Sequence, residues 1–122
     1  MNQIEEIVEQ SLLYDFYGEL LTENRKRIYE AVVFHDLSLS EVAEQEGITR
    51  QGVFDMLKRT HRALAEYENK LGLVEKFNRT KKCLAMIRHH ADAMEDSGML
   101  DTKMKEDLSQ IRRLADSIEE LL

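Results

Sequence analysis

Proline is absent from all 122 residues of this chain, and only five glycines interrupt it. Proline removes a backbone donor and clashes inside a helix, and glycine weakens a helix, so the residues that most often end helices are scarce. Apolar residues recur at intervals of three and four nearly throughout, which is the spacing of one face of an α-helix. The chain is therefore predicted to be all-α.

The apolar spacing and the capping residues divide the chain into two predicted parts. Residues 1–70 should form a bundle of four helices. They are expected at about 4–20, at 23–35 with Thr22 as the N-cap, in a short stretch after Ser38, and at about 50–70 with Thr49 as the N-cap. Leu71-Gly72-Leu73 is a break, after which residues 71–122 should form a long antiparallel helical hairpin. That hairpin is expected to pack on the first part or to extend it. Its seam should hold Met86, Met94, Met99 and Met104, with Cys83 half-buried beside it.

Residues 39–58 have the pattern of a helix-turn-helix. Ser38-Leu39-Ser40-Glu41 is a capping box, Ala43 is the small residue at which two helices cross, and Gly47 allows a tight left-handed turn. Ile48 is expected to pack into the core beside the turn, and Val53 should anchor the second helix by packing into the same core. Glu46 departs from the pattern, because such motifs usually carry an apolar residue there.

The charge is unevenly distributed along the chain. The net charge is −7, which does not favour nucleic-acid binding. Residues 1–48 hold 3 basic and 11 acidic side chains (net −8), and residues 91–122 hold 4 basic and 9 acidic (net −5). Residues 49–90 hold 10 basic and 4 acidic side chains (net +6). The second helix of the motif lies in this basic third, which favours a nucleic-acid partner.

The first turns of that second helix carry the candidate nucleic-acid-binding residues, since a docked helix-turn-helix turns this end toward the bases. Arg50 suits a guanine edge or a phosphate, and Gln51 suits an adenine edge. Asp55 would repel phosphates unless it accepts from a cytosine amino group or pairs with Arg59. The alternative is that these charges only solvate an exposed helix face. The full set is Thr49, Arg50, Gln51, Phe54, Asp55, Lys58, Arg59 and Arg62.

A second basic cluster follows, which could extend the electropositive surface toward a phosphate backbone. For most of its residues, the solvated outer face of a helix is the better explanation. The cluster consists of Lys76, Arg79, Lys81, Lys82 and Arg88, with His89 and His90 adjacent.

Nothing in the sequence indicates an enzyme, and we expect no catalytic residue, no metal and no cofactor. His89 and His90 diverge by about 100° on a helix and would not share a metal comfortably. His89, Asp92 and Asp96 do share a face, which a surface ion-pair ladder explains more simply. A single cysteine favours a reduced, cytoplasmic setting, and no apolar run is long enough for membrane insertion.

Residues 21–50, from Leu21-Thr22-Glu23 through Ser38–Glu44 to Gly47-Ile48-Thr49-Arg50, resemble the promoter-reading fourth region of bacterial sigma factors. Leu13–Thr22 together with Thr49–Thr60 resembles the YlxM family of small bacterial helix-turn-helix proteins. The likeness covers residues 12–73. It implies nucleic-acid binding and a regulatory or accessory part in the signal recognition particle pathway, because genes of that family tend to lie beside those of the particle's protein and its receptor. It implies no catalytic residues.

Two hypotheses for the function follow. In the first, the motif binds nucleic acid, and DNA is favoured over RNA. In the second, the motif is only a scaffold in a protein-interaction or oligomerisation module. Wide apolar stripes at 4–20 and 104–122 also predict a homodimer through the terminal helices.

Overall fold

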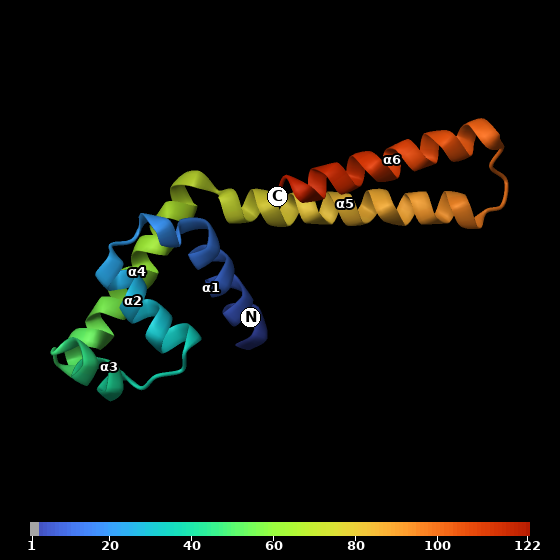
Figure 1. Cartoon of the computed structure of the whole chain (residues 1–122). Coiled ribbons are helices and arrows are strands. Elements are labelled where there is room, and N and C mark those ends of the chain that lie inside the picture. Colours follow the sequence, from blue (N-terminus) through green and yellow to red (C-terminus); the bar gives the residue numbers. More distant parts are fainter. Residues whose placement is uncertain (1–2) are drawn as a thin grey trace. The chain divides into compact units, whose positions relative to one another are not determined.

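The computed structural model describes the backbone of residues 3–122 and the side chains from residue 9 onward. Within that part every regular element is helical, so the all-α prediction is confirmed (Figure 1). The chain divides into two compact units, of which the first ends at Val74 and the second is Glu75–Leu122. The inward positions Ile4, Ile7 and Val8 of the first predicted stripe lie outside the described side chains.

Four α-helices and two irregular turns make up most of the first unit. In order they are α1 (Gln3–Tyr17), the 3₁₀ turn η1 (Gly18–Leu20), α2 (Glu23–Tyr29), the π-helical turn η2 (Glu30–Phe34), α3 (Leu39–Glu46) and α4 (Arg50–Leu71). The predicted caps are confirmed: Thr22 accepts from the Arg25 N–H, and Ser38 and Glu41 form the capping box.

The second helix departs from prediction because it widens into a π-turn after Tyr29. The His35 N–H donates to the carbonyl of Glu30 (3.0 Å), five residues back instead of four. The side chain of Glu30 accepts a hydrogen bond from the Tyr14 hydroxyl of α1. This contact spans 16 residues and lies in the segment where the turn forms, so the local apolar spacing could not reveal it.

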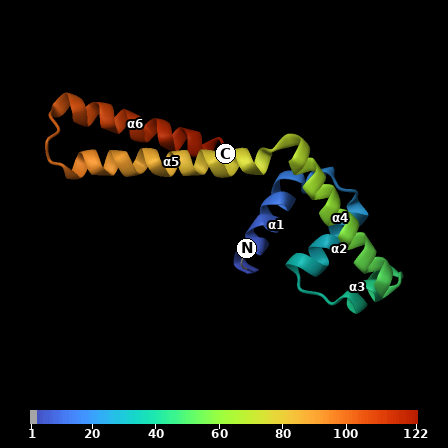
Figure 2. The same cartoon turned by 180° about the vertical axis from the view of Figure 1, so that it is seen from behind.

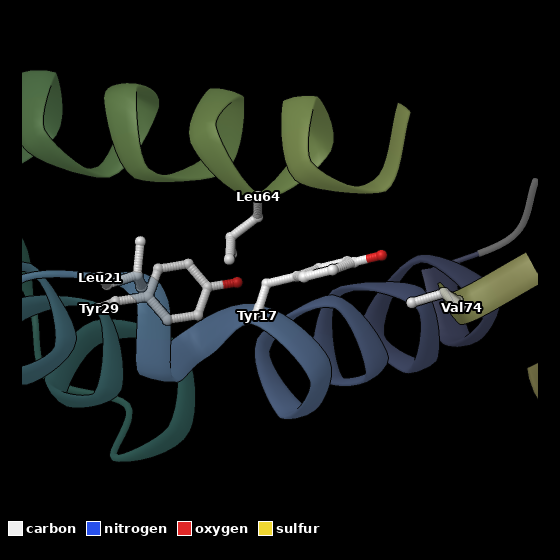
Figure 3. Packing of buried hydrophobic residues seen from close by; sticks show 5 residues of the cluster. All are labelled: Tyr17, Leu21, Tyr29, Leu64 and Val74. Carbon is white, nitrogen blue, oxygen red and sulfur yellow. The ribbon is translucent and has the colours of Figure 1, made fainter. Parts of the chain in front are cut away.

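A buried cluster of apolar residues joins α1, α2 and α4 at the centre of the first unit. Its members are Tyr17, Leu21, Tyr29, Leu64 and Val74. Leu64 points from α4 into the space between the rings of Tyr29 and Tyr17 (Figure 3). Tyr17, Tyr29 and Leu64 are each 1% exposed.

A hydrogen-bonded network stabilises the junction between α4 and α5 (Leu73–Asp96). Gly72 adopts the left-handed conformation at φ 63°. The Tyr17 hydroxyl donates to Glu68 Oε1 (2.6 Å) and accepts from the Leu73 N–H (3.1 Å). Glu68 Oε1 also accepts from the Val74 N–H (2.9 Å). Two backbone donors that begin α5, which a helix leaves without internal partners, are thereby satisfied.

Tyr29 differs from Tyr17 in that its buried hydroxyl has no hydrogen-bond partner among the described residues. Tyr29→Phe should therefore raise the free energy of unfolding, by about 1 kcal/mol, since it removes a desolvated group that no bond offsets. Tyr17→Phe is the matched control and should lower it by about 1–2 kcal/mol, because the Leu73 N–H loses its acceptor. Chemical denaturation measures both, and a destabilised Tyr29→Phe would contradict the assignment.

A second buried cluster packs the two helices of the helix-turn-helix, α3 and α4, against α2. It consists of Ile28, Val42, Ala43 and Val53. Val42 is 1% exposed, and Val53 is 0% exposed, as predicted for Val53. Gly47 has φ 68°, so the left-handed turn is also confirmed. The prediction for Ile48 is wrong: its side chain is 40% exposed and lies near Gly52 rather than in the core.

The second unit is a helical hairpin, in which α6 (Thr102–Glu120) runs back alongside α5 (Figures 1 and 2). Its buried seam consists of Leu84, Ala91, Leu108 and Ala115. Two arginines close one flank of the seam. Arg88 pairs with Asp116 (3.0 Å) and Glu119 (2.7 Å), and Arg112 pairs with Asp92 (3.0 Å) and Glu95 (2.6 Å).

The predictions for the hairpin's sulfur-containing residues are wrong. Met86, Met94, Met99 and Met104 are 62%, 44%, 83% and 48% exposed, and Cys83 is also exposed. Two helices touch along one line only, and small Ala91 and Ala115 occupy part of it. The residues beside that line consequently stay open to solvent.

Candidate nucleic-acid interface

The helix-turn-helix leaves the outer face of the first turns of α4 exposed to solvent. Thr49 caps α4 by accepting from the Gly52 N–H (2.9 Å). Val53, Thr60 and Leu64 are buried along the inner face of the helix. Because residues at intervals of three and four share a face, the side chains between them must project outward.

All eight side chains predicted to bind nucleic acid are exposed: Thr49, Arg50, Gln51, Phe54, Asp55, Lys58, Arg59 and Arg62. They cover the solvent side of α4 over its first turns. This region holds four basic residues and one acidic residue between positions 50 and 62.

Phe54 forms an apolar spot on this basic surface. Its side chain is 44% exposed, and the Lys58 ammonium lies 5.6 Å from its ring centroid. A hollow of about 510 Å³ opens beside it, lined by Leu39, Arg50, Gln51 and Phe54. The hollow therefore combines apolar walls with side chains that can hydrogen-bond to a base edge.

Asp55 is held by a partner that the sequence did not predict. Its carboxylate accepts from the Gln51 amide (3.0 Å), whereas pairing with Arg59 was the expected alternative. The Gln51 amide has a second N–H and its carbonyl oxygen left for an adenine edge, so Asp55 can orient this amide while it binds.

The sequence reasoning missed Arg25 of α2. Arg25 and Arg59 line the same small hollow of about 270 Å³, together with Gly52, Asp55 and Met56. The capping residue Thr22 placed Arg25 in the first turn of α2, but only the packing of α2 on α4 brings it to the reading helix. The Arg25 guanidinium is thus added to the basic side chains near Arg59.

Glu46, the residue that departs from the motif, is bound by Arg27. Both carboxylate oxygens accept from the guanidinium, each at 2.7 Å. The Arg27 hydrogen bond lowers the pKa of Glu46. A carboxylate at this position is thus held by α2 instead of facing the reading surface unpaired.

The second basic cluster belongs to the hairpin. Lys76, Arg79, Lys81 and Lys82 are exposed, and Arg88 is engaged in its ion pairs with α6. Among the described residues, no group of three His, Cys, Asp or Glu side chains is placed to hold a metal ion. None of the helices described is both long enough and apolar enough to cross a membrane.

Comparison with known proteins identifies relatives over nearly the whole chain. The profile of the family UPF0122, described as "Putative helix-turn-helix protein, YlxM / p13 like", matches residues 4–107 and so extends into the hairpin. A UPF0122 protein of Desulforamulus reducens is 47% identical over 85 residues, which cover 70% of this chain and 73% of that protein. One from Acetivibrio thermocellus is 37% identical over 119 residues, 98% of both chains. One from Listeria monocytogenes is 34% identical over 104 residues, 85% of this chain and 92% of that protein.

Proposed function

The chain belongs to the UPF0122 family of YlxM/p13-like helix-turn-helix proteins, and on that premise we propose that it is a non-enzymatic regulatory or accessory protein that binds duplex DNA. The binding surface is the exposed face of α4 from Thr49 to Arg62. The single observation that carries the proposal is that all eight predicted contact residues lie on this face while α4 keeps a continuous buried side.

The chemistry of this face suits a duplex. A major groove admits an α-helix, and its walls are lined by phosphates. Lys58, Arg59 and Arg62 suit phosphate contacts farther along α4, and Arg50 lies at the N-terminal end that faces the bases. The only acidic residue on the face, Asp55, already accepts a hydrogen bond from Gln51.

A fluorescence-anisotropy titration of the full chain against a random duplex of about 30 base pairs tests the proposal. If four phosphates are neutralised, raising the salt from about 50 to 200 mM should weaken binding on the order of 100-fold. Absence of binding at the lower salt concentration, or an affinity that does not change with salt concentration, would contradict the proposal. Because the chain resembles YlxM, the same titration is carried out with the RNA of the signal recognition particle. We expect this RNA to bind more weakly than the DNA duplex.

We further propose that two copies of the chain associate through the hairpin. Apolar side chains flank the buried seam on the side opposite the arginine ion pairs: Ile87, Met94, Met104, Ile111 and Ile118, each 39–48% exposed. They recur every seven residues on both helices, which is the spacing of a seam in a four-helix bundle. Each hairpin supplies two helices, so a second copy would complete the bundle. In α1, by contrast, Leu12, Leu13 and Phe16 already pack against the first unit's core.

Sedimentation at tens of micromolar should accordingly give twice the chain mass of 14.3 kDa. Ile111→Glu combined with Ile118→Glu should give the single-chain mass, because it places charges in the proposed contact while Leu108 and Ala115 stay in place. Met86→Glu changes a methionine that is 62% exposed and lies off the proposed contact, so it should remain dimeric. A parent protein that sediments as a monomer would refute the association.

A further inference from the structure

Phe54 is the large apolar side chain that stays partly exposed on the proposed reading surface. Val53 on its N-terminal side is fully buried, whereas Phe54 exposes 44% of its surface among polar and charged neighbours. The apolar area that remains exposed contributes to the hydrophobic effect only when a partner covers it. Its position therefore indicates an apolar contact with whatever binds the surface.

The surroundings of Phe54 narrow the chemistry of that contact. The Lys58 ammonium, one turn along the same helix, lies over the Phe54 ring at 5.6 Å from its centroid. In the adjoining hollow, Leu39 adds a second apolar wall, and Arg50 and Gln51 add hydrogen-bonding groups. An apolar group next to hydrogen-bonding groups matches the major-groove edge of an A·T pair. That edge presents the thymine C5-methyl group beside O4 and the adenine N7 and N6.

We infer that Phe54 reads the C5-methyl group of a pyrimidine in the major groove, so that the protein prefers sites with thymine at this position. The inference rests on the proposed DNA binding and adds a chemical feature that the DNA must carry. Arg50 and Gln51 would then contact hydrogen-bonding edges close to the methyl group.

Duplexes that differ only in this methyl group test the inference. The full chain is titrated against a duplex of alternating dA and dT and against the same duplex with dU in place of dT. The parent protein should bind the thymine duplex at least threefold more tightly. Phe54→Ala should abolish this preference and leave the salt dependence unchanged, and Phe54→Leu should keep part of the preference. Alternating dG and dC, with and without 5-methylation of dC, should show a preference of the same sign.

The outcomes separate the inference from the proposed function. Equal, salt-dependent binding of the parent to the thymine and uracil duplexes overturns the inference and leaves DNA binding in place. A preference that survives in Phe54→Ala also overturns it, because the methyl group would then act through DNA shape. No binding to any of the four duplexes overturns the proposed DNA binding itself. Thermal melting of the two variants checks that they remain folded.

Discussion

Replacing both Arg50 and Lys58 by glutamate should weaken binding to duplex DNA at least tenfold, about 1.4 kcal/mol. The change removes two cations from the exposed face of α4 and adds two charges that repel phosphate. The dependence of log K on log salt should become shallower, because about two fewer counterions are released on binding. Folding should be preserved, because both side chains are exposed and changes of exposed charge usually shift stability by less than about 0.5 kcal/mol. Anisotropy titrations at several salt concentrations measure both quantities.

Two further variants complete this test. Lys105→Glu with Arg113→Glu makes the same change in net charge on α6, where both residues are exposed, and should leave affinity and salt slope close to the parent's. Asp55→Asn removes the acidic group from the reading face and should tighten binding to any duplex. If the α4 double variant binds as well as the parent, the helix-turn-helix is a scaffold and the partner is a protein.

Leu64→Ala should lower the free energy of unfolding by about 2–5 kcal/mol, the range for a buried leucine that leaves a cavity. Leu64 is 1% exposed and packs in the cluster of Tyr17, Leu21, Tyr29 and Val74. Urea unfolding followed by circular dichroism measures the loss. Leu71→Ala is the control on the same helix, since Leu71 is 49% exposed, and should cost under about 1 kcal/mol. Equal effects of the two substitutions would mean that Leu64 does not hold the core.

The parts of the fold that local chemistry determines were predictable from the sequence. The caps at Thr22, Ser38 and Thr49, and the left-handed turn at Gly47, depend on residues within a few positions of one another. The π-turn Glu30–Phe34 was not predictable, because the contact between Tyr14 and Glu30 joins two separate helices. Apolar spacing indicates which face of a helix is apolar but carries no information on such contacts.

The errors at the methionines and at Cys83 share one physical reason. Helical periodicity groups apolar residues on a face, yet it does not tell how many neighbours that face meets. In the hairpin one neighbouring helix covers Leu84 and Ala91 and leaves Met94 at the side. When an apolar stripe is wider than the line along which the neighbouring helix packs, the residues at its edges stay exposed in the single chain.

For the candidate site, the sequence predicted which side chains face outward but not how they are held. The exposure of Arg50, Lys58 and Arg62 follows from their position on α4 relative to the buried Val53. The pairing of Glu46 with Arg27 spans 19 residues and depends on how α2 packs, so no local rule anticipates it. Arg25 reaches the surface for the same reason.

The central claim is that the first turns of α4 contact duplex DNA, and backbone amide chemical shifts of the full chain test it most directly. Adding a random duplex should shift the amides of Thr49 to Arg62 together with Arg25. Amides of α6 should move little. Shifts confined to residues 75–122, or no shifts at saturating duplex, would contradict the claim.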